Sequence, residues 1–311
     1  GGVGSGISGR VSSARQEVLG GVEAGGTKFV CVTGTADGTI LSRERFDTRD
    51  PQSTVAEMRD FFARLISDGQ QLAAIGVAAF GPLELRRAHA EFGHIGVTPK
   101  AGWSHTDLVG PLAQFGVPVV IDTDVNGAAL GEGTWGAATG LDQFVYLTVG
   151  TGIGGGVVAG GVTVQGLVHP EIGHISVGRL AGDDFAGVCP FHGDCFEGMA
   201  SGPAIAARWG RPAEDLSGDD LVRAVDVEAA YLAAGIRNVV YTVAPQRIVI
   251  GGGVRNLPGL FPAVRRHLAD QLNGYPGLAE HGADDFVVAA GCGDDAGTMG
   301  ALALAASAEG K

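Results

Sequence analysis

The stretch EVLGGVEAGGTKFVCVTG (residues 17–34) contains two apolar runs that are separated by a glycine-rich turn. Short apolar runs around such a turn are typical of two buried strands joined by a tight connection. The segment QFVYLTVGTGIGGGVVAG (residues 143–160) has the same organisation in the second half of the chain. The sequence therefore predicts two similar halves of mixed α/β type with a cleft between them.

The segments around these two repeats alternate between strand and helix patterns. Apolar residues recur at helical spacing over 53–67, and helices are also expected from 125 and from 294. Buried strands are expected over 72–80, 117–124 and 247–253. The polar stretch 81–105 is too long for a simple connection and predicts a functional loop or a hairpin.

Composition narrows the class of protein. The 311 residues are 45% hydrophobic, which suits a substantial core, and the formal net charge is −13. Such an acidic chain repels nucleic acid and anionic membranes, so neither is an expected partner. No apolar run is long enough to span a membrane. Four cysteines, two of them close to histidines, favour a reducing compartment, and we expect a cytoplasmic protein.

The expected domain organisation follows from the repeat. Residues 1–17 are rich in glycine and serine, lack the apolar segment of a signal peptide and predict a flexible leader. An N-terminal α/β domain is expected over 18–122, joined by the C-terminal helix 295–310. A C-terminal α/β domain is expected over 123–294.

Three glycine clusters lie at the ends of apolar strands. GVEAGGTK (21–28) is not a P-loop, because Thr27 precedes Lys28 and a strand follows; it is a phosphate cradle of another topology or an ordinary hairpin. GTGIGG (150–155) matches the dinucleotide fingerprint, but a strand follows it too, which argues against NAD. Together with Gly251–Gly253, these loops favour a nucleotide held by the backbone.

Several carboxylates lie where a ligand would bind. Asp122 and Asp124 end a strand, and that end of an α/β sheet faces the ligand crevice. Asp124 is either the base that takes a proton from a hydroxyl group in phosphoryl transfer or the cap of the next helix. Glu171 and Glu197 are candidates for binding sugar hydroxyls, whereas Asp295 is expected to cap a helix.

A metal site is predicted in residues 169–195. Two thiols and two imidazoles with one close triplet fit tetrahedral zinc, and four protein ligands would close its shell and make it structural. The candidate ligands are His174, Cys189, His192 and Cys195. His169 is a competing ligand, and the alternative is buried cysteines with surface histidines and no metal. Because Glu171 is three residues before His174, a bound metal would also fix Glu171.

These motifs together resemble the ROK family of bacterial sugar kinases over residues 18–308, and EAGGTKF and TPKAGW are most similar to its fructokinases. The motifs that carry the resemblance are GGVEAGGTKF (20–29), DTDVNGAALGE (122–132), GTGIGGG (150–156), HPEIGH (169–174), CPFHGDCFEGMASGPA (189–204) and IVIGGGV (248–254). The resemblance implies an actin-like, ribonuclease H-like two-domain fold with a cleft between the domains. It also implies phosphorylation of a hexose with ATP and Mg²⁺, a structural Zn²⁺ and a homodimer.

The resemblance assigns roles by motif. Asp124 corresponds to the catalytic base, and the four candidate metal ligands fall on the family's zinc ligands. The positions implied to bind the hexose are Glu171, Glu197, Asn126 and Lys100. The positions implied to contact ATP are Gly25, Gly26, Thr27, Lys28, Thr151, Gly152, Pro203, Gly251, Gly252 and Gly253.

The chain departs from the family's glucokinases. It has Glu23 where they usually have Asp and Thr123 where they have Asn. It also has His192 as a candidate zinc ligand, whereas the zinc cluster of the glucokinases is rich in cysteine. We therefore predict an ATP-dependent fructokinase. The alternatives are a broad-specificity hexokinase, mannokinase or glucokinase, and a non-catalytic sugar-sensing regulator. The residues before the first strand are too few for the helix-turn-helix module of the family's repressors.

Overall fold

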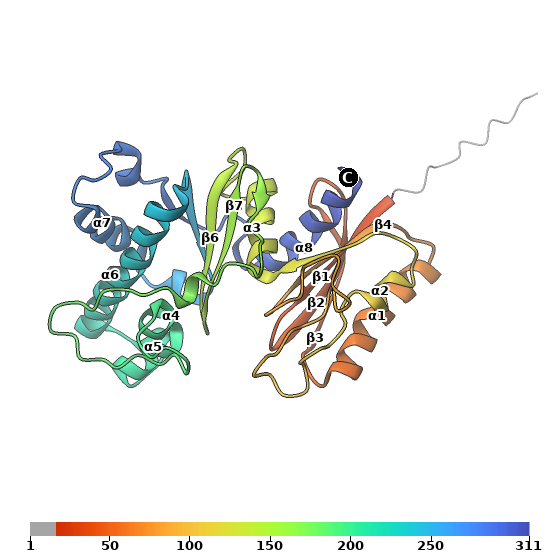
Figure 1. Cartoon of the computed structure of the whole chain (residues 1–311), viewed down its shortest axis with the longest axis horizontal. Coiled ribbons are helices and arrows are strands. Elements are labelled where there is room, and N and C mark those ends of the chain that lie inside the picture. The colour runs from red at the N-terminus through yellow and green to blue at the C-terminus, as the bar shows by residue number, and fades with distance from the viewer. Residues whose placement is uncertain (1–16, 311) are drawn as a thin grey trace, which may run out of the picture.

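The computed structural model describes residues 17–310, and its strands form two five-stranded sheets that lie side by side (Figure 1). The first sheet contains β1 (Glu17–Ala24), β2 (Lys28–Gly34), β3 (Ile40–Asp47), β4 (Gln71–Ala79) and β5 (Val119–Thr123). The second contains β6 (Gln143–Val149), β7 (Ile153–Ala159), β8 (Val162–Thr163), β9 (Arg247–Gly251) and β10 (Val287–Ala289).

Both sheets have the same topology. Their orders are β3-β2-β1-β4-β5 and β8-β7-β6-β9-β10, so the second sheet repeats the first strand for strand. In each sheet the first three strands pair antiparallel, and the last two add in parallel. The repeat predicted from the two glycine-interrupted segments is confirmed.

Helices cover both faces of both sheets. The α-helices are α1 (Pro51–Ser67), α2 (Gly110–Ala113), α3 (Asp124–Trp135), α4 (Phe196–Ala200), α5 (Gly202–Trp209), α6 (Gly218–Val243), α7 (Leu260–Leu272) and α8 (Ala296–Ala306). The short 3₁₀ turns are η1 (Ile172–His174), η2 (Ala213–Asp215), η3 (Gly253–Asn256), η4 (Ala279–Gly282), η5 (Gly293–Asp295) and η6 (Ser307–Gly310). We call the first sheet with α1, α2 and α8 the first lobe, and the second sheet with α3 to α7 the second lobe.

The two lobes meet through a pair of helices. α8 packs on β1 and β4 of the first sheet, α3 packs on β6 and β7 of the second, and α3 and α8 pack on each other (Figure 1). Glycines allow this close approach. A Cβ atom on Gly300 of α8 would overlap the backbone of Gly127 in α3, and one on Gly131 would lie 2.8 Å from the Gly300 nitrogen.

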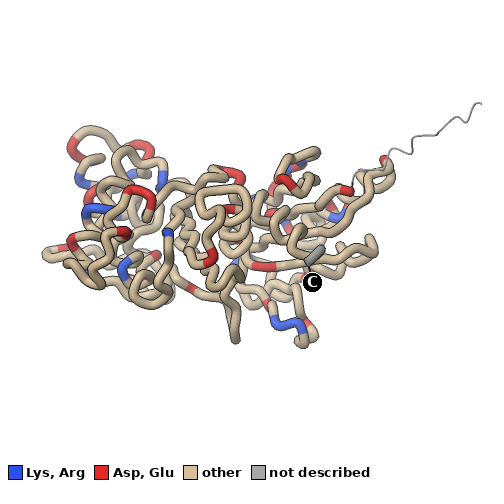
Figure 2. The backbone as a smooth tube through the Cα atoms, turned by 90° about the horizontal axis from the view of Figure 1, so that it is seen from above, with Lys and Arg blue, Asp and Glu red and all other residues tan. Residues whose placement is uncertain are grey.

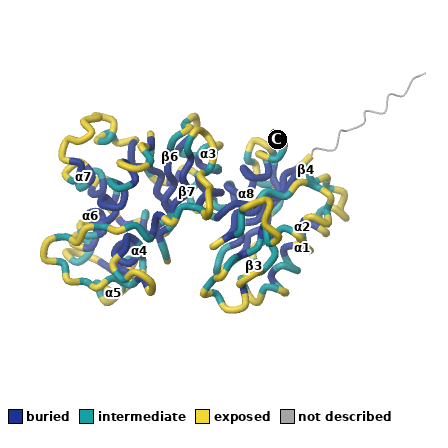
Figure 3. Tube along the Cα trace, in the orientation of Figure 1, coloured by how far each residue is buried: buried dark blue, intermediate teal, exposed yellow. Residues whose placement is uncertain are grey.

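Each lobe has its own apolar core, with buried residues concentrated on the sheets and on the helices that cover them (Figure 3). Acidic and basic residues are scattered over both lobes (Figure 2). Within residues 17–310, no helix is both long and apolar enough to cross a membrane. The predicted leader lies outside the described residues except for Glu17, which already belongs to β1.

Candidate active site

Asp124 is the first residue of α3, at the point where β5 ends. The residue that caps this helix is Thr123, whose hydroxyl accepts a hydrogen bond from the Asn126 backbone N–H at 3.1 Å. The alternative that Asp124 is the cap is therefore wrong. The Asp124 Oδ1 accepts a hydrogen bond from the Val125 N–H at 2.8 Å, and the helix start does not need this carboxylate as its cap.

The surroundings of Asp124 change its acidity. Burial raises the pKa of Asp124 to about 6, and the Glu23 carboxylate adds to the rise. The Val125 N–H and the His169 imidazole act in the opposite direction, because both favour the ionised form. At neutral pH such a carboxylate is mostly ionised, yet it binds a proton more strongly than an ordinary aspartate. These are the properties of a general base.

A cavity of about 220 Å³ between the lobes has Asp124 in its wall. Glu23 of β1 lines it from the first lobe, and Gly252 and Gly253 line it from the second. The Thr298 hydroxyl donates a hydrogen bond to Glu23 at 2.7 Å and so holds this carboxylate in place. The cavity thus brings the predicted base next to one of the predicted nucleotide loops.

The same cavity contains Arg255, a residue that the sequence analysis missed. Arg255 donates hydrogen bonds to the Gly252 carbonyl at 3.1 Å and to Asp294 at 2.7 Å, and its side chain is only 13% exposed. A guanidinium at a glycine loop is well suited to bind phosphate. The available signal was a basic residue directly after the GGGV sequence.

The turn η5 carries two neighbouring carboxylates with different partners. Asp294 pairs with Arg255 and lines the cavity. Asp295 occupies the position before α8, where we expected it to act as a cap, but its side chain makes no capping hydrogen bond. It pairs instead with Arg43 at 2.9 Å, so this expectation was wrong.

A second cavity, of about 900 Å³, meets the first at Gly253. Three residues predicted to contact nucleotide, Thr151, Pro203 and Gly253, lie in its wall. The Gly202 N–H donates a hydrogen bond to the Gly150 carbonyl at 2.7 Å and joins two of the loops that form it. Its volume is in the usual range for a bound small molecule.

The remaining glycine positions shape the loops. Gly252 has φ of 80°, and a Cβ atom there would overlap the Val149 carbonyl. Gly251 and Gly152 pack closely against Tyr146 and Glu197, so neither has room for a side chain.

The turn Gly25–Gly26–Thr27–Lys28 lies beside the cavities rather than in their walls. The Gly25 N–H donates to the Lys28 carbonyl at 2.9 Å, and Lys28 Nζ lies 3.9 Å from Glu23. Their contact with nucleotide stays a prediction.

Asp122 does not line the crevice, contrary to expectation. It is 3% exposed and ties β5 to the segment after β7. It accepts four hydrogen bonds, from Thr123 N, Asn126 Nδ2, Thr163 Oγ1 and Gln165 Nε2, at 2.7 to 2.9 Å. Asn126 is fully buried, and its Oδ1 has no hydrogen-bond partner within residues 17–310. Lys100 lies in a turn outside both cavity walls. Sugar binding by Asn126 and Lys100 stays a prediction.

The two glutamates predicted to bind sugar have different surroundings. The Glu171 side chain is 55% exposed, and its Oε1 lies 3.4 Å from His169 Nδ1. Glu197 lies in the first turn of α4 and accepts a hydrogen bond from the Ile153 N–H at 3.0 Å. This bond ties α4 to the start of β7, next to the turn that carries Thr151.

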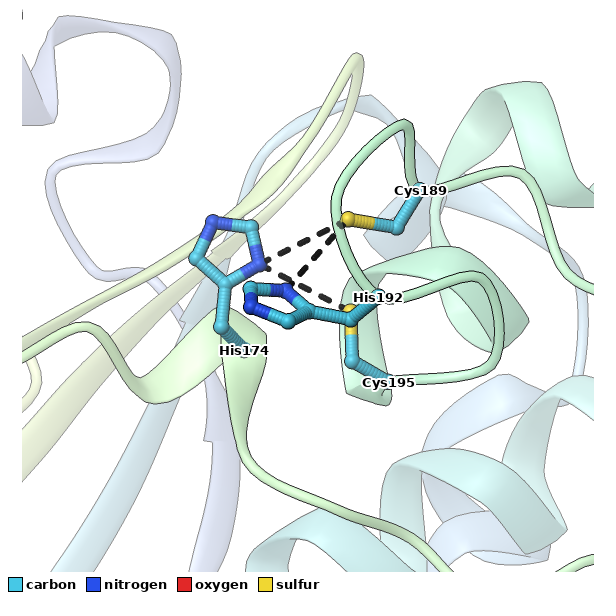
Figure 4. Close-up of side chains that lie close together, drawn as sticks. All are labelled: His174, Cys189, His192 and Cys195. Carbon is cyan, nitrogen blue, oxygen red and sulfur yellow. Dashed lines mark hydrogen bonds between the residues drawn. The ribbon is translucent and has the colours of Figure 1, made fainter.

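The four predicted metal ligands come together (Figure 4). His174 ends η1, Cys195 precedes α4, and Cys189 and His192 lie in the turn between them. All four donor atoms lie within 4.8 Å of one another. His169 is not part of this cluster, so the structure gives no support to it as a competing ligand.

The cluster has the donor set and spacing that zinc requires. Three sulfur–nitrogen separations are 3.6, 3.8 and 3.8 Å. Tetrahedral zinc, with bonds of about 2.3 Å to sulfur and about 2.0 Å to nitrogen, requires separations of about 3.6 Å. Four protein ligands would leave no open position, which is the arrangement of a structural site. Cys31 is outside the cluster and is buried in the core of the first lobe.

Comparisons with known proteins agree with this arrangement. The model of the ROK family matches residues 19–308. A putative fructokinase from Bacillus subtilis is 42% identical over 93% of this chain and 95% of its own. A fructokinase from Zymomonas mobilis is 43% identical over 95% of this chain and 99% of its own.

Solved structures extend the agreement to the fold. The ROK hexokinase from Thermus thermophilus superposes with a TM-score of 0.77 at 29% identity, over 94% of this chain and 99% of its own. A ROK family glucokinase from Streptomyces griseus, in complex with glucose and AMPPNP, gives 0.68 at 27% identity over 93% and 99%. The predicted actin-like α/β fold of two lobes is confirmed. The chain belongs to the ROK family.

Proposed function

We propose that this protein phosphorylates D-fructose to fructose 6-phosphate with ATP. The observation that carries the proposal is Asp124, a carboxylate with a pKa of about 6 in the wall of a cavity that also contains a glycine loop and an arginine. The relatives named fructokinase, which align over nearly the whole chain, support fructose as the substrate.

Asp124 would act as the base. The sugar hydroxyl that attacks the terminal phosphorus of ATP would pass its proton to this carboxylate as the new O–P bond forms and ADP leaves. Because Asp124 begins α3, the helix holds its backbone rigidly next to the Gly252 and Gly253 loop. The raised pKa makes the carboxylate a better proton acceptor while it stays ionised at neutral pH.

Each of the two cavities would hold one part of the nucleotide. The larger one would hold the adenosine, since Leu216, Leu221 and Leu257 give it an apolar wall. The phosphates would cross at Gly253 into the smaller cavity, where backbone N–H groups and Arg255 would bind them. The three carboxylates there are oxygen ligands of the kind Mg²⁺ prefers, and Mg²⁺ bound with ATP would offset phosphoryl charge.

The metal cluster would act on structure alone. Zn²⁺ bound by His174, Cys189, His192 and Cys195 would join η1 to α4, and Glu171 directly precedes η1. We further propose a cytoplasmic homodimer, as the family resemblance implies. Its two domains, 18–122 with 295–310 and 123–294, would close over both substrates and exclude water.

The experiment that tests the proposal is ADP release with ATP and Mg²⁺ against fructose, mannose, glucose and N-acetylmannosamine in parallel. A kcat/KM for fructose at least about tenfold above the others is expected, which is about 1.4 kcal/mol at the transition state. Comparable rates on several hexoses would replace fructokinase with a broad hexose kinase, the name that the Thermus thermophilus relative carries. Hexose binding without ADP release would point to a sugar-sensing regulator.

A further inference from the structure

His169 does not belong to the metal cluster and has no role in the mechanism proposed above. It follows β8 in the second lobe, and its side chain is only 9% exposed. Its Nδ1 lies 3.4 Å from Oε1 of Glu171. Its Nε2 is buried and has no hydrogen-bond partner among the described residues. A buried polar atom without a partner is costly, so a group that binds here would remove that cost.

The unpartnered nitrogen lies at the boundary between the lobes. A Cβ atom on Gly81, which follows β4 of the first lobe, would lie 3.3 Å from His169 Nε2. A positive charge on the imidazole would lower the pKa of the Asp124 carboxyl group, which indicates that the two side chains lie within range of electrostatic interaction. His169 therefore lies beside Glu171 of its own lobe and Gly81 of the other, at the boundary where a substrate could be held between the lobes.

The contact with Glu171 indicates whether the unpartnered Nε2 is a hydrogen-bond donor or an acceptor. A carboxylate oxygen accepts hydrogen bonds, so the Glu171 Oε1 at 3.4 Å favours the tautomer of His169 that carries its proton on Nδ1. In a neutral imidazole the other nitrogen then has a lone pair and accepts a hydrogen bond. A sugar hydroxyl is a donor of suitable size for this position.

We infer that His169 contacts the sugar: its Nε2 accepts a hydrogen bond from a hexose hydroxyl next to the one that Asp124 deprotonates. This inference rests on the proposed function and deepens it, because it assigns a sugar-selecting contact to a residue outside the ligand positions implied by the motifs. Glu171 orients the imidazole ring of His169, in addition to any contact that Glu171 itself makes with the sugar.

Two substitutions separate the two nitrogens. His169→Asn can keep a hydrogen bond to Glu171 but has no atom at the Nε2 position, whereas His169→Gln can place an amide oxygen near it. We expect H169Q to keep kcat/KM for fructose within about threefold, and H169N and H169L to lose about tenfold to a hundredfold. His281, which packs on Phe286 at another cavity, gives the control H281L, with unchanged kinetics expected.

A series of monodeoxy fructose analogues distinguishes a contact from a merely structural role. In the wild type, removing the hydroxyl that donates its hydrogen bond to His169 should lower kcat/KM by about tenfold. In H169L, which lacks the acceptor, the same removal should not lower kcat/KM any further. Removal of the other hydroxyls should cost both proteins equally. The metal content of all His169 variants should equal that of the wild type, because His169 is outside the cluster.

The outcomes are distinct. If the wild type phosphorylates fructose but H169N and H169L keep full activity, or lose it equally with every analogue, the assignment of His169 is overturned and the fructokinase proposal stands. If none of the hexoses causes the wild type to release ADP, the proposed function fails and the His169 contact fails with it.

Discussion

Asp122 and Asp124 are two residues apart and have opposite surroundings. Asp122 is buried and accepts four hydrogen bonds, whereas Asp124 lies in a cavity wall and has a raised pKa. The first carboxylate stabilises the fold. The second is ionised at neutral pH although its burial disfavours the charge. It is therefore available as a base, and its charge lowers the stability of the fold.

Asp124→Asn tests both properties. We expect kcat to fall by about 10²- to 10⁴-fold, because the amide cannot take the proton, while fructose binding is largely kept. The melting temperature should rise, because the variant no longer buries a charge that the fold disfavours. Steady-state kinetics, fructose titration and thermal unfolding measure the three effects. A near-normal kcat would rule out Asp124 as the base.

Asp122→Asn is the matched control. An amide can replace only part of the acceptor capacity of the carboxylate, so donors from Asn126, Thr163 and Gln165 lose partners. We expect a loss of about 1 to 3 kcal/mol in the free energy of unfolding, measured by urea denaturation. An unchanged midpoint would show that these bonds contribute little.

The pH dependence of activity follows from the same carboxyl group. The base acts only when ionised, and the protonated fraction grows as the pH falls through the pKa of about 6. We therefore expect kcat/KM to be level above about pH 7 and to fall about tenfold per unit below pH 6. A profile from pH 4.5 to 8 measures this; a level profile down to pH 5 would contradict it.

Arg255 sits at the point where we place the phosphates of ATP. Its present partner Asp294 is 92% exposed, and such a pair is weak, so a triphosphate can replace the carboxylate. Arg255→Met should raise KM for ATP by about tenfold or more with little change in KM for fructose. Arg255→Lys should recover only part of the loss. An equal effect on both substrates would indicate a general disturbance of the cleft.

At the scale of elements, the metal cluster joins pieces too short to be stable alone. η1 carries His174, the turn that follows contains Cys189 and His192, and Cys195 directly precedes the five residues of α4. Removal of the metal should therefore loosen the whole segment and, through η1, the position of Glu171.

Chelation gives the corresponding prediction. A strong chelator should lower the melting temperature and the activity together, and added zinc should restore both. Elemental analysis of the purified protein should find about one zinc per chain. Full activity in protein with far less zinc would exclude a structural role for the metal.

Local patterns were enough for the ligand set and for the strands at the centre of each sheet, but they did not predict β3, β8 or β10. Apolar runs around glycines predicted both hairpins, and the spacing of His174, Cys189, His192 and Cys195 predicted their convergence. The errors concern competition between neighbours or contacts between distant segments. Thr123 and Asp124 are both good caps, and only the backbone decides between them. Asp295 found Arg43, and Arg255 entered the cavity, through contacts that no local pattern contains.

At the scale of the whole molecule, α3 and α8 are the link between the lobes. α3 begins with Asp124, and α8 begins directly after Asp294 and Asp295 of η5, so both ends of the smaller cavity depend on this helix pair. Its glycines permit the contact, because a Cβ atom on Gly300 would overlap Gly127.

Gly300→Ala should therefore push the two helices apart. We expect a loss of about 1 to 3 kcal/mol in the free energy of unfolding, together with lower activity, since Asp124 moves relative to Glu23. Gly178→Ala is the control, because a methyl group there meets open space. Urea denaturation and the ADP-release assay compare the two variants. Equal stability of both would contradict tight packing at this contact.

The position of α8 also affects how the protein is made. Its residues Ala301, Leu302 and Leu304 complete the apolar core on one face of the first sheet, yet they follow the entire second lobe in the chain. On the ribosome, the sheet that is translated first therefore keeps one face uncovered until the second lobe has been synthesised. The nascent chain must avoid aggregation through that face during elongation, and its first lobe is completed last.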